Sequence, residues 1–217
     1  MIPTNRLFTR REPDKDAKSI YIFCEGRKRE SQYFQYFRGI DSRINIEVYQ
    51  LRADEDNSPV GLYKIAQNCL VVSAENLSPK YEFLPGDEVW FVIDTDQWGE
   101  KIAELREKSQ QHQSWHIAQS NPCFEVWLYY HFSGERVPLD WPDVCNDWKN
   151  LLPQIILGGF DAKKHPIYVK NAIENSKKFF LTDANGMPVV ASTEVFKLAE
   201  VIYQVCRWKI ERLLHRL

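Results

Sequence analysis

The chain has 217 residues, of which 44% are hydrophobic and 27% carry a charged side chain. A folded chain of this length buries roughly 70% of the surface that its unfolded form exposes, so we expect a globular core that needs no disulfide or structural metal. The 28 basic and 30 acidic side chains give a formal net charge of −2, which argues against binding to nucleic acid through bulk positive charge. Any contact with nucleic acid would have to be local, or helped by bound metal ions.

Several other classes of protein are excluded by missing patterns. The five cysteines include no CxxC pair of the zinc-binding kind, and their odd number indicates free thiols in a reducing compartment. No apolar stretch approaches the ~18 residues of a membrane span, and the first residues lack the apolar segment of a secretory signal. Neither a GxGxxG nor a Walker A sequence occurs. We therefore expect a cytoplasmic protein that binds no nucleotide through these motifs.

Short apolar runs alternate with helical patterns in the first part of the chain. Residues 1–18 are charged and have no apolar period, so we expect a flexible arm. The expected strands are 19–24, 44–51, 87–94 and 114–119, and the expected helices are 30–37, 60–72, 99–111 and 122–132. Asn121 is expected to cap the last helix, with Pro122 in its first turn. Alternating strands and helices predict an α/β fold with a parallel sheet flanked by helices.

The pattern changes after Gly134. Strand signals disappear, and three helical stretches are expected near 141–157, 165–181 and 192–216. We interpret residues 19–134 as the α/β core and residues 135–217 as a C-terminal helical extension packed on that core.

Acidic residues follow two of the expected strands. Glu25 comes directly after the first strand, and Asp94 and Asp96 stand at the end of the third. The carboxyl ends of parallel strands share one edge of the sheet, where open α/β folds place their chemistry. If these two strands are neighbours, about 4.8 Å apart, the three carboxylates converge. A divalent cation that prefers oxygen ligands, Mg²⁺ or Mn²⁺, would relieve their repulsion.

Each acid also has a purely structural interpretation. Glu25 can belong to a turn, and the DxD segment can be a polar end of a strand. Glu125, expected in the first turn of the fourth helix, can compensate the helix dipole or add a carboxylate to the same edge. The joint occurrence of these acids favours the metal site.

Basic and aromatic residues near the acids are further candidates. Arg27, Lys28 and Arg29 follow Glu25, and such a run is either a solvated surface or a clamp for the phosphates that flank a scissile bond. Lys163 has the same two interpretations. Trp98 is the tryptophan that we expect to line a cleft, and we expect His131 to be a core residue.

Three segments carry a resemblance to a known family: SIYIFCEGRKRESQYF from Ser19, VWFVIDTDQW from Val89 and QSNPCFEVWLYYHF from Gln119. Together they resemble the RloB-like family of Toprim-related proteins, which are found beside restriction and abortive-infection genes. The resemblance is clear over about residues 18–132 and continues more loosely to Ile202. Its most specific segment is SNPCFE, because EG and DxD are shared by all Toprim relatives.

The resemblance implies a Toprim-like core in which Glu25 is a general acid or base, besides the metal contact that its place at the strand end suggests. It makes Asp94 and Asp96 metal ligands, and it places Asn121 and Glu125 at the active-site edge.

The first loop and the residue after the DxD are where the sequence departs from the family pattern. The resemblance gives Glu30 a supporting role in the first loop. That loop often reads EGxxTE in the family, whereas Arg29 stands at the threonine position here. The DxD is often followed by another acid, and Gln97 stands there instead, a change that would weaken one metal position or alter the metal preference.

Toprim chemistry is the cleavage of phosphodiester bonds. The resemblance therefore implies an Mg²⁺- or Mn²⁺-dependent nuclease for DNA or RNA, with tRNA among the candidate targets. It also implies antiphage defence together with an ABC- or AAA-type ATPase from a neighbouring gene. A topoisomerase is excluded because the chain has no room for the separate domain that would carry the tyrosine nucleophile.

Two alternatives stand beside the nuclease. The chain could be a non-catalytic Toprim module that binds nucleic acid or regulates an ATPase. A haloacid-dehalogenase-type phosphatase also uses a DxD, but on its first strand, whereas the acids here follow the third expected strand.

Overall fold

The computed structural model describes residues 9–95, 98–138, 141 and 143–216. At its centre is a sheet with the strand order β2-β1-β3-β4-β5. The strands are β1 (Lys18–Cys24), β2 (Ile44–Val48), β3 (Glu88–Asp94), β4 (Trp115–Asn121) and β5 (Ser192–Thr193). The first four are parallel, and β5 pairs antiparallel with the end of β4. The predicted α/β fold with a parallel sheet is confirmed, and the architecture is consistent with a Toprim-like core.

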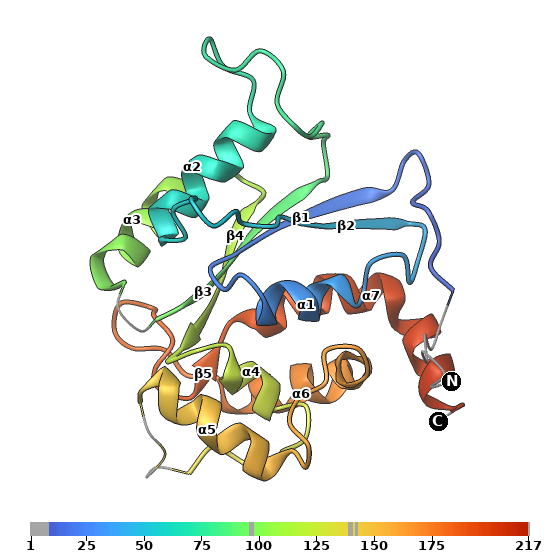
Figure 1. Cartoon of the computed structure of the whole chain (residues 1–217), viewed down its shortest axis with the longest axis vertical. Helices are drawn as coiled ribbons and strands as arrows, with labels where there is room; N and C mark the ends of the chain where they lie inside the picture. Colours follow the sequence, from blue (N-terminus) through green and yellow to red (C-terminus); the bar gives the residue numbers. More distant parts are fainter. Residues whose placement is uncertain (1–8, 96–97, 139–140, 142, 217) are drawn as a thin grey trace.

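Helices cover both faces of this sheet (Figure 1). They are α1 (Arg29–Gln35), α2 (Pro59–Leu70), α3 (Gly99–Ser109), α4 (Glu125–Tyr129), α5 (Cys145–Ile155), the 3₁₀ helix η1 (His165–Tyr168), α6 (Val169–Phe179) and α7 (Val195–Leu214). Helices α2 and α3 lie on one face, and α1 and α7 lie on the other. Helices α4, α5 and α6 pack on the side of α1 and α7.

The strands divide their side chains between two hydrophobic cores, because successive residues of a strand point to opposite faces. On β1, Ile22 faces the α1 and α7 side, and Phe23 faces α2 and α3. Trp148 of α5 and Ile210 of α7 are fully buried in the same core as Ile22. The C-terminal helices therefore complete the core on that face of the sheet.

The end of β4 differs from the expectation. Asn121 is the last residue of β4, and α4 begins only at Glu125. The predicted helix cap at Asn121 is therefore wrong, because this residue still belongs to the sheet. Its side-chain amide donates a hydrogen bond to the Pro188 carbonyl at 2.8 Å, and the Asn121–Pro122 peptide bond is cis.

Strand β5 was not expected, because a helix was predicted from residue 192. Ser192 pairs with Asn121 and Thr193 pairs with Ser120, so the last helix begins at Val195. The Ser120 and Thr193 side-chain oxygens are 2.8 Å apart and hydrogen-bonded. The C-terminal part of the chain thus contributes to the sheet as well as covering it.

The residues before β1 run along the surface. Arg11 N donates to Gly39 O at 2.9 Å, and Asp14 N donates to Ser42 O at 2.7 Å. Residues 1–8 of the expected arm lie outside the described residues. No helix among the described residues combines the length and apolar character needed to cross a membrane.

Candidate active site

Two acidic residues meet where neighbouring strands end. Strands β1 and β3 are paired, with Cys24 opposite Val92, so their carboxyl ends lie side by side. Glu25 N donates to Val92 O at 2.9 Å, and Glu25 Oε2 accepts from the backbone N–H of Asp94 at 3.0 Å. The sheet therefore brings Glu25 and Asp94 together, as the strand ends predicted.

Trp98 holds the other oxygen of Glu25. Its indole Nε1 donates a hydrogen bond to Glu25 Oε1 at 2.6 Å. Trp98 stands at the start of α3, so this contact ties the first turn of that helix to the end of β1. The orientation of the Glu25 carboxylate is fixed by two N–H donors from different elements.

Asp94 connects the end of β3 with the start of α4. Its Oδ1 accepts from the backbone N–H of Phe124 at 2.9 Å, directly before Glu125. Burial, with the charges of the nearby Glu30 and Glu25 carboxylates, holds the pKa of Asp94 well above the usual value for an aspartate. Like charges are thus crowded at this edge of the sheet.

Glu125 and Arg29 form an ion pair in the same place. The Glu125 residue is 2% exposed, and its Oε1 accepts from the Arg29 guanidinium. The Arg29 side chain, at the first residue of α1, is half exposed. Arg29 therefore places a positive charge against the buried carboxylate of Glu125, while the Arg29 side chain itself remains partly open to solvent. We call Glu25, Glu30, Asp94 and Glu125 the carboxylate cluster.

Glu30 is buried beside Gly26. The Glu30 carboxyl lies where a Cβ on Gly26 would be, so no larger residue fits at Gly26 unless Glu30 moves. Burial and the charge of Glu125 raise the pKa of Glu30. The glycine after Glu25 therefore makes room for a second carboxyl group under the first loop.

Lys149 of α5 is a charged neighbour of the cluster that sequence reasoning missed. Its burial lowers its pKa, but the negative charges of Glu125 and Asp94 among its neighbours raise it more, and the net shift is upward. In the sequence, Lys149 is separated from the strand-end carboxylates by α4 and the loop after it. The packing of α5 on α4 brings Lys149 close to them. The WKN sequence around it carries no signal of this role.

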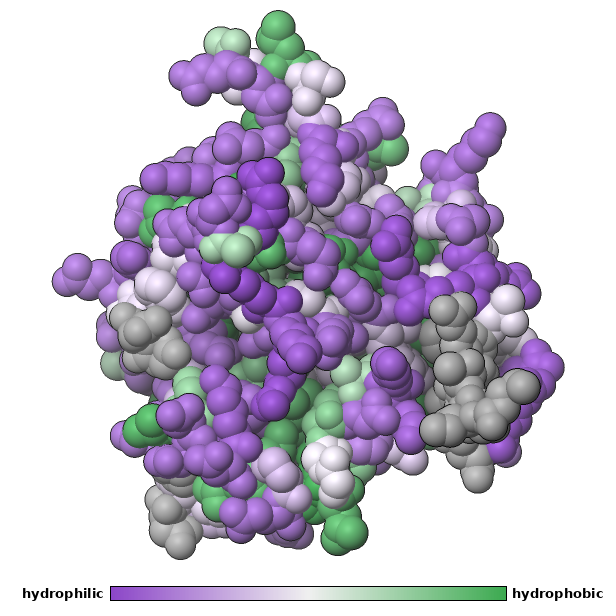
Figure 2. Space-filling model, in the orientation of Figure 1, coloured by the Kyte–Doolittle hydropathy of each residue, from purple (hydrophilic) through white to green (hydrophobic). Residues whose placement is uncertain are grey.

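The other predicted site residues lie elsewhere or cannot be placed. Asp96 lies outside the described residues. Arg27 Nη2 donates to the Ala53 carbonyl at 2.9 Å, and Lys28 is exposed just before α1. Lys163 is exposed in the loop before η1, and no contact within the described chain links it to the carboxylates. Figure 2 shows a mainly hydrophilic face that includes α1 and the loop before it.

A family model described as RloB-like protein matches residues 20–202. The chain belongs to the RloB-like family. The matched region begins in β1, includes all the carboxylates described above and ends within α7. Comparison with curated proteins and with solved structures found no match.

The structure gives a physical account of one departure from the RloB-like pattern. Arg29 stands where the family often has threonine, and its guanidinium pairs with Glu125. A threonine at this position is uncharged and short, so it could not form an ion pair with Glu125. Gln97, the other departure, lies outside the described residues.

The donor chemistry at this edge fits a divalent cation that prefers oxygen. Glu25 and Asp94 supply carboxylate oxygens from adjacent strand ends, and burial together with like-charge crowding already disfavours the ionised form of Asp94. Among the described residues, no three His, Cys, Asp or Glu side chains are placed to share one ion. Glu25 and Asp94 are thus the two described members of the predicted ligand set, whose third member is Asp96.

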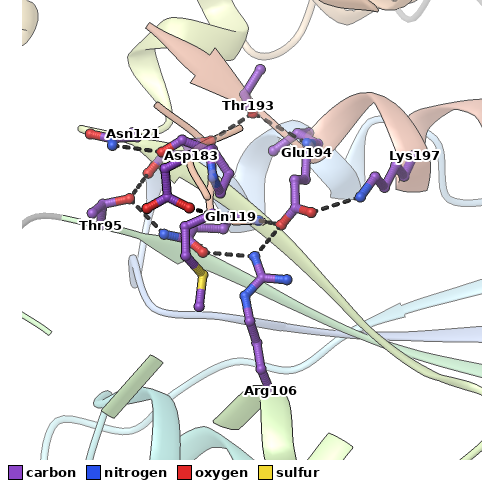
Figure 3. Close-up of polar contacts among 12 residues, drawn as sticks. Thr95, Arg106, Gln119, Asn121, Asp183, Thr193, Glu194 and Lys197 are labelled. Carbon is purple, nitrogen blue, oxygen red and sulfur yellow. Dashed lines mark hydrogen bonds and ion pairs between the residues drawn. The ribbon is translucent and has the colours of Figure 1, made fainter. Parts of the chain in front are cut away.

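A polar network supports the residue that follows Asp94 (Figure 3). Thr95 Oγ1 accepts from Gln119 Nε2 at 2.8 Å, and Gln119 Oε1 accepts from Arg106 Nη2 at 2.7 Å. Arg106 also pairs with Glu194, and Glu194 accepts from Lys197 Nζ at 2.6 Å. Gln119 and Glu194 are each 2% exposed. Buried groups from α3, β4 and the start of α7 thus fix the backbone beside the carboxylates.

Proposed function

We propose that this RloB-like protein is a divalent-cation-dependent nuclease that hydrolyses phosphodiester bonds of DNA or RNA. The observation that carries the proposal is the meeting of Glu25 and Asp94 at the ends of neighbouring parallel strands, with Glu30 and Glu125 close enough to act electrostatically on Asp94. The family resemblance supports a role in antiphage defence with an ATPase partner. Asp96 completes the proposed ligand set.

Glu25 is suited to move a proton at a fixed position. The N–H groups of Asp94 and Trp98 each donate to one of its oxygens, so the carboxylate is oriented before substrate arrives. In the proposed reaction it takes a proton from the attacking water or returns one to the leaving oxygen. A cation bound by Asp94, Asp96 and Glu25 would supply Lewis acidity, by activating the water and stabilising the leaving oxygen.

Arg29 and Lys149 are the cations placed to receive the substrate backbone. Both act on Glu125, and both side chains reach solvent. A phosphate that flanks the scissile bond would share these charges, which are local and therefore compatible with the net charge of −2. Nothing in this arrangement reads a base, so DNA, RNA and tRNA are all candidate targets.

One observation favours the non-catalytic alternative. Arg29 already neutralises Glu125 within the carboxylate cluster, as a bound cation would do in part. A Toprim module stabilised in this way could bind nucleic acid or regulate an ATPase without cleaving a bond.

Cleavage of mixed DNA and RNA substrates, tRNA included, tests the proposal. The purified protein is assayed with Mg²⁺, with Mn²⁺ and with EDTA, beside Glu25→Gln, Asp94→Asn and the control Glu104→Gln, which removes an exposed carboxylate of α3. We expect metal-dependent cleavage that falls about 100-fold or more in the first two variants and is unchanged in the control. Cleavage that survives both substitutions, or that persists in EDTA, contradicts the proposal.

If the purified protein cleaves no substrate, one further experiment is needed. The assay is repeated with the ATPase encoded beside the gene and with ATP. Cleavage that appears only in this mixture and is lost in Glu25→Gln supports a partner-dependent nuclease. The absence of cleavage in every mixture supports the non-catalytic module.

A further inference from the structure

Strand β4 has an outer edge that can be read from its pairing with β3. Val89 N donates to Ser114 O, and Thr95 N donates to Ser120 O, both at 2.9 Å. In a parallel pair the backbone groups of alternate residues point to the same neighbour. The even-numbered residues of β4 therefore bond to β3, and the odd-numbered residues point away from it.

Only the last part of this outer edge is covered. Gln119 O accepts from Glu194 N at 2.7 Å, and Asn121 O accepts from Ala191 N at 2.8 Å. Ile117 belongs to the same outward set but lies before the stretch that pairs with β5. Trp115 N donates to His112 O at 3.3 Å, so the outward groups left without a partner among the described residues are Trp115 O and the N–H and C=O of Ile117. These groups form a short open strand edge, of the kind that pairs readily with another extended chain.

A cavity of about 420 Å³ lies along this open edge. We call it the β4 groove. Its floor includes Trp115 and Ile117 of β4, and its walls include Arg106 and Ser109 of α3 and Lys197 of α7. The groove thus follows the strand edge between the helices that cover the two faces of the sheet.

The β4 groove holds hydrogen-bonding groups that nothing in the described chain satisfies. Ser109 is 4% exposed, and its hydroxyl has no partner among the described residues. The Nε of Arg106 is buried and likewise has no partner there. Unpaired buried polar groups are costly, and an occupant would recover that cost where the Ser109 and Arg106 side chains turn towards it.

Charge and shape indicate which occupant fits. Arg106 and Lys197 share one carboxylate, that of Glu194, so the groove has an excess of positive charge. Trp90 and Trp115 are each 5% exposed, so neither offers an open ring face for stacking a base. The open backbone edge instead suits an extended polypeptide with an acidic side chain.

We propose that the β4 groove docks an extended, acidic segment of a partner protein, which adds to the sheet as a strand in line with β5. The stretch 115–118 spans about 13 Å, which is enough for a short added strand. Backbone groups of the segment pair with Ile117, and its carboxylate meets Arg106 and Lys197. The proposal does not depend on nuclease activity.

The first test selects displayed random peptides of about ten residues on the purified chain, with counter-selection on Ile117→Pro. The Ile117 N–H points away from β3, so proline removes a groove donor and leaves the β3 bonds in place. We expect enriched peptides that combine β-branched residues with Asp or Glu. Synthetic copies should bind about tenfold more weakly to Ile117→Pro and to Lys197→Gln, and equally well to Lys170→Gln, which removes an exposed charge of α6.

A second measurement stays informative if Ile117→Pro does not fold. Methylation of alternate backbone nitrogens of the best peptide should abolish binding in one register and spare it in the other, because only one set faces β4. Failure to enrich acidic peptides, equal binding to all variants, or indifference to methylation overturns the proposal. A dimer in sedimentation that Ile117→Pro converts to monomer also overturns it, because a second copy then occupies the groove.

Discussion

At the residue scale, the orientation of Glu25 depends on two N–H donors that carry no charge. Trp98 donates to one oxygen of Glu25, and the backbone of Asp94 donates to the other. The indole also contacts Lys101, whose Nζ lies 4.8 Å from the ring centre. Trp98 thus connects the proposed proton-transfer group with the start of α3. A smaller aromatic ring without the N–H would keep part of the packing but lose the hydrogen bond that orients Glu25.

Substitution of Trp98 by Phe tests this role. If the proposed nuclease reaction uses Glu25, the cleavage rate constant should fall about tenfold, equivalent to roughly 1.4 kcal/mol, because one charge-assisted hydrogen bond is lost. The melting temperature should change little, since Trp98 is only partly buried and an aromatic ring remains. Trp208→Phe, on an exposed part of α7, serves as the control. A variant with full activity would show that Trp98 does not orient Glu25 in the reaction.

The Arg29–Glu125 pair makes a second prediction at this scale. Glu125 is buried, whereas the Arg29 side chain is 49% exposed, so the pair should be worth less than a fully buried one. A double-mutant cycle with Arg29→Gln and Glu125→Gln, followed by urea unfolding, should give a coupling energy of about 1–2 kcal/mol. Additive single substitutions would mean that water already screens the pair.

At the element scale, the start of α7 is tied to the sheet by buried charge. Glu194 precedes α7, and its carboxylate receives Arg106 of α3 and Lys197 of α7. The same residue offers its backbone N–H to Gln119 of β4. Three elements that are distant in the sequence therefore meet at one carboxylate, 2% exposed.

Glu194→Gln should destabilise the protein by about 2 kcal/mol, because Arg106 loses its charge partner in a partly buried place. Lys197→Gln should cost about 0.5 kcal/mol or less, since its side chain is 44% exposed. Urea unfolding of the two variants beside the wild type gives both values. Equal losses in the two variants would contradict the assignment of Arg106 as the main partner of Glu194.

The elements that the sequence predicts correctly are those with a strong local pattern. The run Val89–Ile93 is apolar throughout, as suits a strand buried on both faces, and β3 forms there. β5 has no such pattern, because Ser192 and Thr193 become a strand only by pairing with β4. The sequence pattern at Asn121 favours a helix cap for the same reason: the place of this residue in the sheet depends on contacts with residues 188–192.

The candidate site divides in the same way. Glu25 and Asp94 are predictable because strand ends are local features and the parallel topology places them at one edge. Trp98 stood out by its position after the DxD. Lys149 and Arg106 were not predicted, because each reaches the site region through tertiary packing that no local spacing reports.

At the scale of the whole molecule, one hydrophobic core joins the N-terminal and C-terminal parts of the chain, and His131 lies within it. His131 is 2% exposed, which confirms that it is a core residue. Its Nε2 lies 3.0 Å from Tyr33 Oη, and its Nδ1 lies 3.0 Å from the Trp127 carbonyl. The ring packs against Phe160, which precedes η1. A positive charge on His131 would therefore be unfavourable for both halves at once.

Burial, with a smaller contribution from the charge of His165, lowers the pKa of His131 to about 3 in the folded protein. In the unfolded chain a histidine titrates near 6.5, so below that pH the unfolded state binds a proton that the folded state does not. The contribution of His131 to the free energy of unfolding is thus fully present above about pH 6.5. It falls as the pH drops towards the pKa of His131 in the folded protein. Between pH 7 and pH 5 the loss should be roughly 2 kcal/mol from this residue.

Urea unfolding at pH 7 and pH 5 measures this difference directly. In His131→Gln the contribution of the ring is gone, so the loss between the two pH values should shrink by roughly 2 kcal/mol, whatever the absolute stability of the variant. His116→Gln is the matched control, because that ring is only half-buried and its pKa is lowered to a lesser extent by burial. If His131→Gln keeps the wild-type difference, the folded protein admits a proton at His131, and the core that joins the two parts of the chain is more open to water than the packing of Tyr33, Trp127 and Phe160 around the ring indicates.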